Sequence, residues 1–392
     1  MPSDQSTWLV AIPQDGDSEG VVEELSTKLS QQSRSFSRSN IAQMSIPSFK
    51  TGTLESLVSL SEELPKQETT FTAVVAKIVD TLRNLLNNDP SKLSQHILVN
   101  EESVDEYLLG GWHWNEGRYG VQRGLREMVD VLIKEMTSID NVMKAKLNNY
   151  NLAKGALVQL QRKKTGNLST RSLADIVSKD NFIQDSEHLE TVLVVVPKNQ
   201  VKEWNSSYER LTTMVVPRSS SVITSDEDYS LFSVIIFKKV HDAFATQCRE
   251  RKYVVRDFHF TEDQVTKERE ELDMADTTEK ELWTELLRLS RTNFSEAFQI
   301  LVHLKVVRLF VESVLRYGLP ANYIGIAIKP EPKATKRTLT LLQGHFSYLS
   351  PRSKGATASK GETTEEVSGE YQTLLDQEFF DFVLYEVPWI VN

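Results

Sequence analysis

The feature that most constrains the fold is a pair of long segments without proline. The first, Val121–Lys164, contains one glycine beyond its first turn, Gly155, and carries apolar residues at spacings of three and four. These positions are Leu125, Met128, Leu132, Met136, Ile139, Met143, Tyr150, Ala153, Leu157 and Leu160. A heptad pattern of this length predicts a helix that packs on a partner along a narrow seam. At 1.5 Å per residue, about 40 residues span roughly 60 Å.

The second segment runs from Thr261 to Tyr317 without proline or glycine. Thr261 and Gln264 have the spacing of a capping box, and Gly318–Pro320 forms a C-terminal stop signal. The predicted helix of about 55 residues would span roughly 80 Å. Its second half, Phe294–Leu315, is almost continuously apolar, which predicts burial on most sides.

Between the two segments, residues 168–260 alternate between apolar, β-prone runs and amphipathic runs. The expected strands are Leu189–Val196, Thr212–Val216, Tyr229–Phe237 and Lys252–Phe258, and the expected helices are Ser172–Ser178, Gln200–Leu211 and Lys238–Arg249. This alternation predicts a small α/β sheet with one face covered.

The two ends of the chain carry further strands and helices. The expected strands are Trp8–Pro13, Ile41–Pro47, Tyr323–Lys329 and Phe379–Val391, and the expected helices are Val21–Leu29, Thr53–Leu64, Thr70–Leu86 and Thr335–Tyr348. Residues 350–370 are polar and of low complexity, which predicts a disordered surface loop.

The order of these elements predicts an elongated dumbbell of mixed α+β and α/β character. One long helix leaves the N-terminal region and the next returns, so a small inserted module lies at the turn between them. The expected parts are a foot (1–120 and 319–392), a neck of two antiparallel helices (121–167 and 261–318) and an α/β head (168–260). The C-terminal half of the second neck helix is expected to pack in the foot. Such a shape is typical of a spacer or clamp.

Composition excludes several classes of function. The net charge of −10 provides no basic field to recruit nucleic acid or anionic lipid. A single cysteine, Cys248, excludes a disulfide framework and a cysteine-rich zinc site. The N-terminus has no basic region, and no apolar run approaches the ~20 residues of a membrane span. We therefore expect a cytosolic protein that reaches a membrane only through partners.

Motifs for cofactor chemistry are absent from the sequence. There is no P-loop, dinucleotide-binding fingerprint, GxSxG, HExxH or DxDxDG motif, and the seven histidines show no pair at metal-ligand spacing. We expect no cofactor and no metal. Cys248 lies near Arg249, Arg251 and Lys252, which could make it reactive, but a lone cysteine is more often a small core residue.

The stretch Gly110–Gly120, GGWHWNEGRYG, has the composition of a site. His113 and Glu116 could form an acid–base pair. The favoured interpretation is structural: the glycines turn the chain into the first long helix, while Trp112 and Trp114 dock on the core from one face of an extended segment. A local basic patch at Lys163–Ser172 is either a solvated turn or a contact for an acidic partner.

Six collinear strings of residues resemble one known family. They are RSLADIV (Arg171–Val177), DSEHLETVLVVVPK (Asp185–Lys198), MVVPRSS (Met214–Ser220), VVRDF (Val254–Phe258), NFSEAF (Asn293–Phe298) and FVESVLRYGLP (Phe310–Pro320). Together with the N-terminal WLVAIP they resemble the C subunit of the vacuolar-type proton ATPase, most closely its fungal, budding-yeast-like form. The polar segment 350–370 and the glycine-rich form of Gly110–Gly120 depart from that pattern.

The resemblance implies a stator component without catalytic activity. In that family the head holds a peripheral stalk made of the E and G subunits. The foot contacts a second stalk and the cytosolic N-terminal domain of the membrane-embedded a subunit, and the protein leaves when the pump disassembles reversibly. The resemblance implies a location on the cytosolic face of vacuolar and other endomembranes.

Partner-binding residues are expected in the head, and Arg171, Lys198 and Arg218 are the candidates. Two alternatives remain open at this point: an actin-binding cytoskeletal adaptor, and a nucleotide-binding enzyme that uses the head sheet and Gly110–Gly120.

Overall fold

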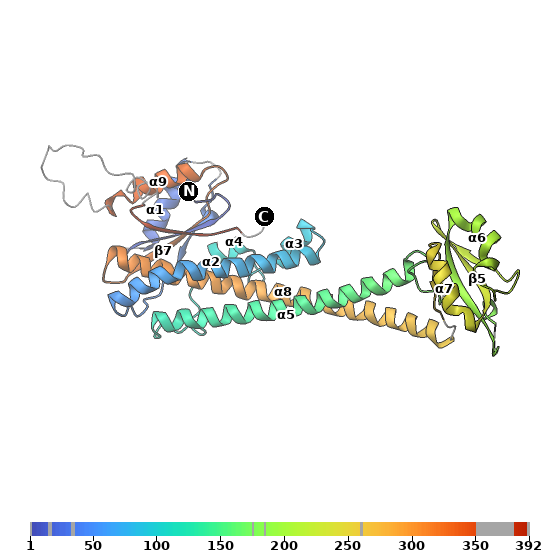
Figure 1. The fold of residues 1–392 in the computed structure, drawn as a ribbon. Helices are drawn as coiled ribbons and strands as arrows, with labels where there is room; N and C mark the ends of the chain where they lie inside the picture. Colours follow the sequence, from blue (N-terminus) through green and yellow to red (C-terminus); the bar gives the residue numbers. More distant parts are fainter. Residues whose placement is uncertain are drawn as a thin grey trace, which may run out of the picture. The chain divides into compact units, whose positions relative to one another are not determined.

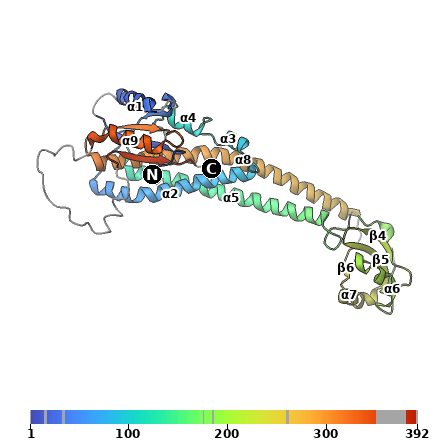
Figure 2. The ribbon, with the colours of Figure 1, turned by 90° about the horizontal axis from the view of Figure 1, so that it is seen from above.

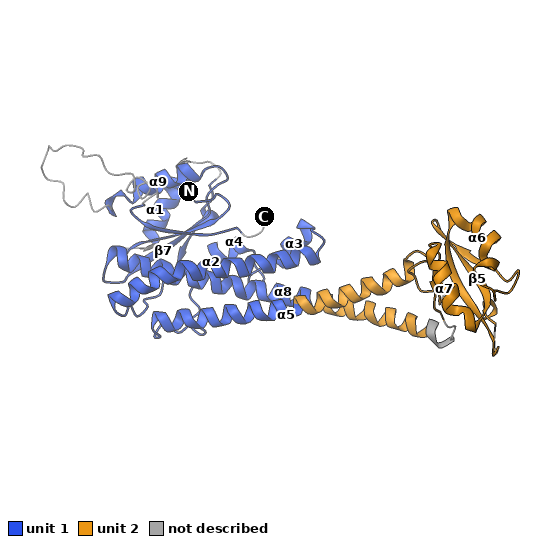
Figure 3. Cartoon of the chain, in the orientation of Figure 1, with its two compact units in different colours: residues 1–146, 285–392 blue, residues 147–284 orange. Residues whose placement is uncertain are grey.

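The structure is a computed structural model that describes residues 2–14, 18–32, 36–174, 176–183, 186–258, 262–349 and 380–389. The chain divides into two compact units (Figure 3). Unit 1 comprises Met1–Lys146 and Glu285–Asn392, and unit 2 comprises Leu147–Thr284. The expected capping residue Thr261 and the expected loop 350–370 lie outside the described residues.

Both long segments are single helices, as their patterns predict. Helix α5 covers Leu125–Thr165 and helix α8 covers Glu262–Tyr317. Helix α5 starts four residues later than expected, because Gly120–Gly124 is a turn in which the Arg123 N–H donates to the Gly120 carbonyl. Helix α8 ends at Tyr317 and is followed by Gly318, whose positive φ of 83° suits glycine.

The heptad seam of α5 is buried at its central positions. Leu132, Met136, Met143, Tyr150 and Leu157 are all buried, and the last four recur every seven residues. Ala153 and Leu160 are less completely buried. The register of the predicted stripe is therefore confirmed within each unit.

The sheet of unit 1 has four antiparallel strands in the order β2-β7-β1-β8. The strands are β1 (Thr7–Pro13), β2 (Ile41–Met44), β7 (Tyr323–Ile328) and β8 (Val383–Val387). The pairing of Trp8 with Ile328 brings the two ends of the chain together in one sheet. Three of these strands, β2, β7 and β8, fall within segments expected from the sequence, and β1 begins one residue before its expected start.

Helices cover both faces of this sheet. Helices α1 (Ser18–Gln32) and α9 (Thr335–His345) pack on one face, where Leu25 and Leu342 join Trp8 and Val10 in a buried cluster. Figure 1 shows α2 (Leu54–Leu85) and α8 on the opposite side. Both Figure 1 and Figure 2 show α2 and the N-terminal part of α5 running alongside α8.

The prediction of two helices between Thr53 and Leu86 was wrong. Helix α2 is continuous through Pro65, although proline removes one helical hydrogen bond and costs about 3 kcal/mol in a helix interior. Its buried positions, including Leu60, Leu64 and Phe71, continue on both sides of the proline. Packing of this apolar stripe against the rest of unit 1 stabilises the helix by more than the lost hydrogen bond costs. The short helices α3 (Pro90–His96) and α4 (Val104–Leu109) were not expected.

The sheet of unit 2 has four antiparallel strands in the order β4-β5-β3-β6. They are β3 (Leu189–Pro197), β4 (Ser221–Ser225), β5 (Tyr229–Phe237) and β6 (Val254–Arg256). Helices α6 (Val201–Ser207) and α7 (His241–Glu250) pack on one face, where Trp204 and Phe244 meet the strands.

Three expectations for unit 2 were wrong. Thr212–Val216 is not a strand: it makes one isolated bridge, Val215 to Ile236, and the unpredicted strand β4 takes the edge position. The described residues of the range 172–178 form a turn in place of a helix, in which the N–H groups of Ile176 and Val177 donate to the Leu173 carbonyl. Both faces of the sheet are covered, because Leu168, Leu173 and Val177 pack on Leu193, Val195 and Leu231. The nearly continuous apolar run of β3 is typical of a strand buried on both sides.

Candidate functional site

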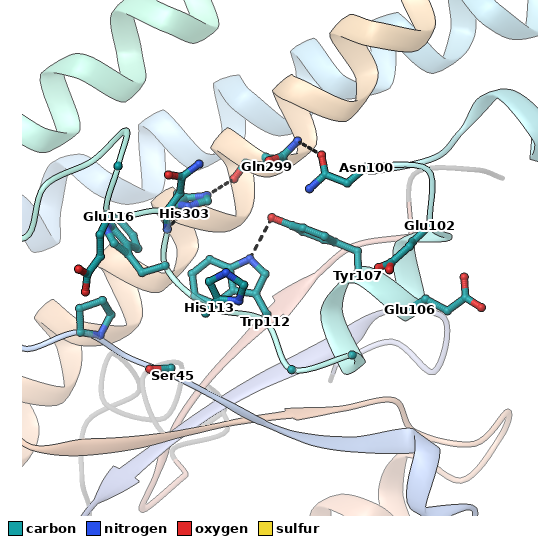
Figure 4. A pocket seen from close by; sticks show the side chains of 16 residues that line it. Ser45, Asn100, Glu102, Glu106, Tyr107, Trp112, His113, Glu116, Gln299 and His303 are labelled. Carbon is teal, nitrogen blue, oxygen red and sulfur yellow. Dashed lines mark hydrogen bonds between the residues drawn. The ribbon is translucent and has the colours of Figure 1, made fainter.

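The first eight residues of the stretch, Gly110 to Gly117, line a cleft of about 800 Å³ in unit 1 (Figure 4). Among the described residues that line the cleft, three are carboxylates and none is a lysine or an arginine. The lining residues are Ser45, Pro47, Asn100, Glu102, Glu106, Tyr107, Gly110, Gly111, Trp112, His113, Trp114, Asn115, Glu116, Gly117, Gln299 and His303. The cleft is therefore acidic and partly aromatic.

Trp112 and Trp114 anchor the stretch in the core of unit 1, as the structural interpretation predicted. Both are buried, and their rings meet edge to face with centroids 6.4 Å apart. The Trp112 Nε1–H donates to Tyr107 Oη at 3.0 Å, and the Trp114 Nε1–H donates to the Tyr119 carbonyl at 2.6 Å. Since both indole donors are satisfied inside the protein, neither ring is a free platform for a ligand.

His303 on α8 packs against the aromatic rings of the stretch. Its ring centroid lies 5.2 Å from that of Trp112, 4.7 Å from that of Trp114 and 5.0 Å from that of Tyr119. Its Nδ1 is 2.7 Å from the Gln299 carbonyl, so Nδ1 carries the proton and donates. Its Nε2 accepts the Asn115 backbone N–H at 3.3 Å.

Burial lowers the pKa of His303 to about 4. The imidazole is therefore neutral at pH 7, and both of its nitrogens are engaged in internal hydrogen bonds. A general base needs a free acceptor nitrogen, so this arrangement supports a structural role.

His113 and Glu116 are not assembled as an acid–base pair. Both are exposed, and no hydrogen bond joins them or holds either side chain to another described residue. A positioned acid or base is normally oriented by a third group, which neither has among the described residues.

The end of the stretch is tied to both long helices by charged hydrogen bonds. The Tyr119 Oη–H donates to Glu135 Oε2 on α5 at 2.5 Å, and burial together with this carboxylate raises the pKa of Tyr119. The Arg118 guanidinium donates to Glu135 at 3.2 Å and to Glu296 on α8 at 2.5 Å. Arg118 therefore joins α5, α8 and the stretch.

A buried ionic group on α8 was missed by the sequence analysis. Lys305 is almost fully buried and donates to Glu68 on α2 and to the Glu386 carbonyl at 2.5 Å. Arg308 donates to the other oxygen of Glu68 at 2.6 Å and lies 4.1 Å over the ring of Tyr385. The available signal was the presence of two cations in an otherwise apolar helical run, since buried charges require partners.

The charges of this group depend on one another. Burial lowers the pKa of Lys305, and the neighbouring Glu68 opposes that shift. Although burial alone would raise the pKa of Glu68, Lys305 and Arg308 hold it below its usual value.

Cys248 is a buried core residue of unit 2, as the favoured interpretation predicted. Burial raises the pKa of its thiol to about 12, which outweighs the opposite effect of Arg251. The alternative of a reactive thiolate was wrong, because the nearby cations do not compensate for desolvation.

The structure does not gather Arg171, Lys198 and Arg218 into one site. Lys198 follows β3 at the Tyr229 end of β5, whereas Arg218 lies beside the middle of β5, between Val216, which bonds to Ile235, and Ser221, which pairs with Ser233. About five to seven residues of strand separate these positions, which corresponds to roughly 16–23 Å. Lys198 and Arg218 are exposed.

Arg171 has different surroundings from the other two candidates. It is half-buried and lines a cavity with Lys163 and Lys164. As a group, the three candidates stay predictions.

Within the described residues, no group of three or more His, Cys, Asp or Glu side chains could hold a metal ion. Among the described helices, none is both long and apolar enough to cross a membrane.

Comparison with known proteins defines the class of this protein. A family model for the C subunit of V-ATPase matches residues 7–383. The C 1 subunit of the V-type proton ATPase of Xenopus laevis is 36% identical over 380 residues, which cover 97% of each chain. The C subunit of the V-type proton ATPase of Manduca sexta is equally similar, at 36% identity and 97% of each chain. The chain therefore belongs to the V-ATPase C subunit family, and the resemblance found in the sequence is confirmed.

One solved structure is similar only at a low level. It is the crystal structure of the cytoplasmic N-terminal domain of the V-ATPase I subunit, a homolog of the a subunit. It matches with a TM-score of 0.33 and 12% identity over 87% of this chain and 97% of that chain.

Proposed function

We propose that this protein is a stator component of a vacuolar-type proton ATPase. In this role it clamps the peripheral stalks, made of the E and G subunits, to the N-terminal cytosolic domain of the a subunit. Its release and rebinding control the reversible assembly of the soluble and membrane sectors. It acts on the cytosolic face of vacuolar and other endomembranes and reaches the membrane only through its partners.

The observation that carries the proposal is family membership over almost the whole chain. The internal organisation of the chain supports it. A clamp needs at least two separate binding surfaces, and the chain has two compact units with separate sheets and separate cores. We assign the E–G stalk to the head, 168–260, and the a subunit with a second stalk to the foot, 1–120 and 319–392.

The acidic cleft gives no support to an enzyme. Its buried histidine, His303, is neutral and hydrogen-bonded on both nitrogens, and its tryptophans are anchored within the core. These residues fix the turn into α5.

Binding of the full chain to purified partners tests the proposal. The full chain is titrated with an E–G heterodimer and, separately, with the N-terminal domain of the a subunit, by isothermal titration calorimetry. We expect binding to both, with modest affinity for each single partner, because a joint that must open gains its strength from several contacts. Absence of heat with both partners would refute the proposal. A parallel titration with ATP tests the alternative of a nucleotide-binding enzyme.

A further inference from the structure

A cavity of about 410 Å³ lies in unit 2, where the C-terminal end of α5 meets the first turns of α8. We name it the helix-end cavity. It is lined by Leu160, Lys163 and Lys164 of α5, by Glu268, Arg269, Glu271 and Leu272 of α8, and by Arg171 and Ser172 of the segment that follows α5. Figure 3 shows these ends of α5 and α8 within unit 2.

Four cations line the helix-end cavity. Lys163, Lys164, Arg171 and Arg269 form no ion pair with any residue that the structure describes. On the same helix as Lys163 and Lys164, Lys146 binds a carboxylate of α8 at 2.6 Å, so an ion pair between α5 and α8 can form. The cations of the cavity are therefore available to an external anion.

Arg171 supplies a second, independent indication. Its Nε is buried and has no hydrogen-bond partner among the described residues. Its backbone is held firmly, because its carbonyl accepts the Arg256 Nη2–H at 2.8 Å and the next residue, Ser172, donates its N–H to the Lys163 carbonyl at 2.5 Å. The two other nitrogens of the guanidinium, Nη1 and Nη2, are not buried and form no hydrogen bond with any described residue, so they can donate to an acceptor from outside the chain.

The charge balance of the cavity suits carboxylates better than a polyphosphate. Four cations and the two carboxylates Glu268 and Glu271 give a net formal charge of +2. Glu268 already accepts a hydrogen bond from the Ser172 hydroxyl at 2.5 Å, and this bond holds one carboxylate oxygen of Glu268 at the wall of the cavity. Leu160 and Leu272 add apolar surface on which the methylene stem of a glutamate can pack.

We propose that the helix-end cavity binds one or two carboxylate side chains of an acidic helical segment of a partner protein. The guanidinium group of Arg171 binds the first of these carboxylates. A guanidinium pairs with a carboxylate through two parallel hydrogen bonds, which sets the register of the partner. This inference rests on the proposed function, in which the partner of this unit is the E–G heterodimer. It moves the expected contact from the sheet, with Lys198 and Arg218, to the ends of the two long helices.

The test compares two full-length double variants with the same change in charge. Lys164→Glu with Arg171→Glu alters the cavity. Lys202→Glu with Arg210→Glu alters two exposed cations of the same unit that do not line it. The dissociation constant for the E–G heterodimer is measured at about 0.05 M and about 0.3 M salt, where surface electrostatics differ through screening.

We expect the cavity variant to bind at least about tenfold more weakly than the unaltered chain, and the control variant to bind within about twofold. The cavity variant should also lose most of the salt dependence. Equal binding by the unaltered chain and the cavity variant would overturn the inference and leave the proposed function intact. Equal weakening of both variants would also overturn it, because general charge steering would then explain the effect.

No binding by the unaltered chain would overturn the inference and the proposed function together. If the charge-reversed variant does not fold, as judged by its thermal midpoint, Lys164→Gln with Arg171→Gln replaces it. The same loss of affinity is expected for this neutral pair, and unchanged affinity would reject the cavity as the binding site.

Discussion

The Nε2 of His303 accepts the backbone N–H of Asn115 at 3.3 Å, although the two residues are 188 positions apart in the sequence. This bond fixes the glycine-rich turn on α8 at the point where the chain enters α5. It also requires a neutral imidazole, which makes the stability of unit 1 sensitive to pH.

Stability should fall as the pH is lowered from about 6.5 to about 4. The pKa of His303 is lowered from 6.5 in the unfolded chain to about 4 in the folded protein, so the unfolded state binds more protons in this window. Stability therefore rises with pH across it, by roughly 3 kcal/mol in total. His303→Gln, which keeps a neutral donor and acceptor, should remove this component of the pH dependence of urea denaturation. His113→Gln is the control, and a pH slope unaltered in the His303 variant would contradict the assignment.

Trp114→Ala should destabilise the protein by about 3–5 kcal/mol, because it removes a buried ring in contact with Phe49, Tyr119 and His303. His113→Ala should change stability by less than about 0.5 kcal/mol, since its side chain is exposed. Thermal denaturation of both variants measures the difference. A loss of partner binding by His113→Ala with the fold intact would assign that exposed histidine to the interface and contradict a purely structural role for the stretch.

Glu68→Gln should cost about 3–5 kcal/mol, because it leaves Lys305 buried without its counter-ion. Glu63→Gln, which removes a more exposed ion pair with Arg126, is the matched control and should cost about 1 kcal/mol or less. Denaturant unfolding at neutral pH gives both values. Combining Glu68→Gln with Lys305→Met should cost less than the sum of the single changes, since the two residues interact directly. Strict additivity would show that the pair does not act as a unit.

Leu132→Asp should destabilise the protein by several kcal/mol, because it leaves an unpaired charge in the buried seam of α5. The structure distinguishes Leu132, which is fully buried, from Ile139, which is half-buried, so Ile139→Asp should cost less. Val142→Asp on the exposed face of the same helix is the control. Thermal midpoints that do not differ between Leu132→Asp and Val142→Asp would argue against the seam.

Cys248 should react slowly with a thiol reagent in the native protein and rapidly once the chain is unfolded in denaturant. Its side chain is inaccessible, and its pKa of about 12 leaves almost no thiolate at neutral pH. A chromogenic disulfide reagent follows the reaction directly. Rapid native-state labelling would show that unit 2 opens locally around α7.

The elongated dumbbell shape stays a prediction of the sequence. The structure describes the mixed helix and strand content and the two antiparallel sheets, and small-angle X-ray scattering of the full chain would test the overall dimensions.

The local spacing of apolar residues was sufficient to predict a helix or strand where one helical or strand period dominated a long segment. The heptad spacing of α5 and the apolar runs of β1, β3, β5 and β7 predicted elements that the structure confirms. Family membership was also readable, because six long strings occur in the right order. The meaning of GGWHWNEGRYG followed partly from the absence of a second catalytic motif in the sequence.

Local pattern failed where distant residues decided the outcome. Two helices were expected, Thr53–Leu64 and Thr70–Leu86, yet packing along α2 keeps one helix intact through Pro65. The Thr212–Val216 run predicted a strand, but it makes only an isolated bridge to Ile236, and the paired strand beside β5 is β4.

The sequence by itself determined most of the helices and strands, the family of the protein and the absence of recognisable catalytic motifs, because these depend on the order and spacing of neighbouring residues. Only the tertiary structure decided that His303 receives the glycine-rich turn, that Glu68 neutralises Lys305 and that a cluster of cations lines a cavity at the helix ends. Hydrogen bonding, burial and charge balance depend on which residues meet in space, and a buried group gains its partner only when the chain has folded.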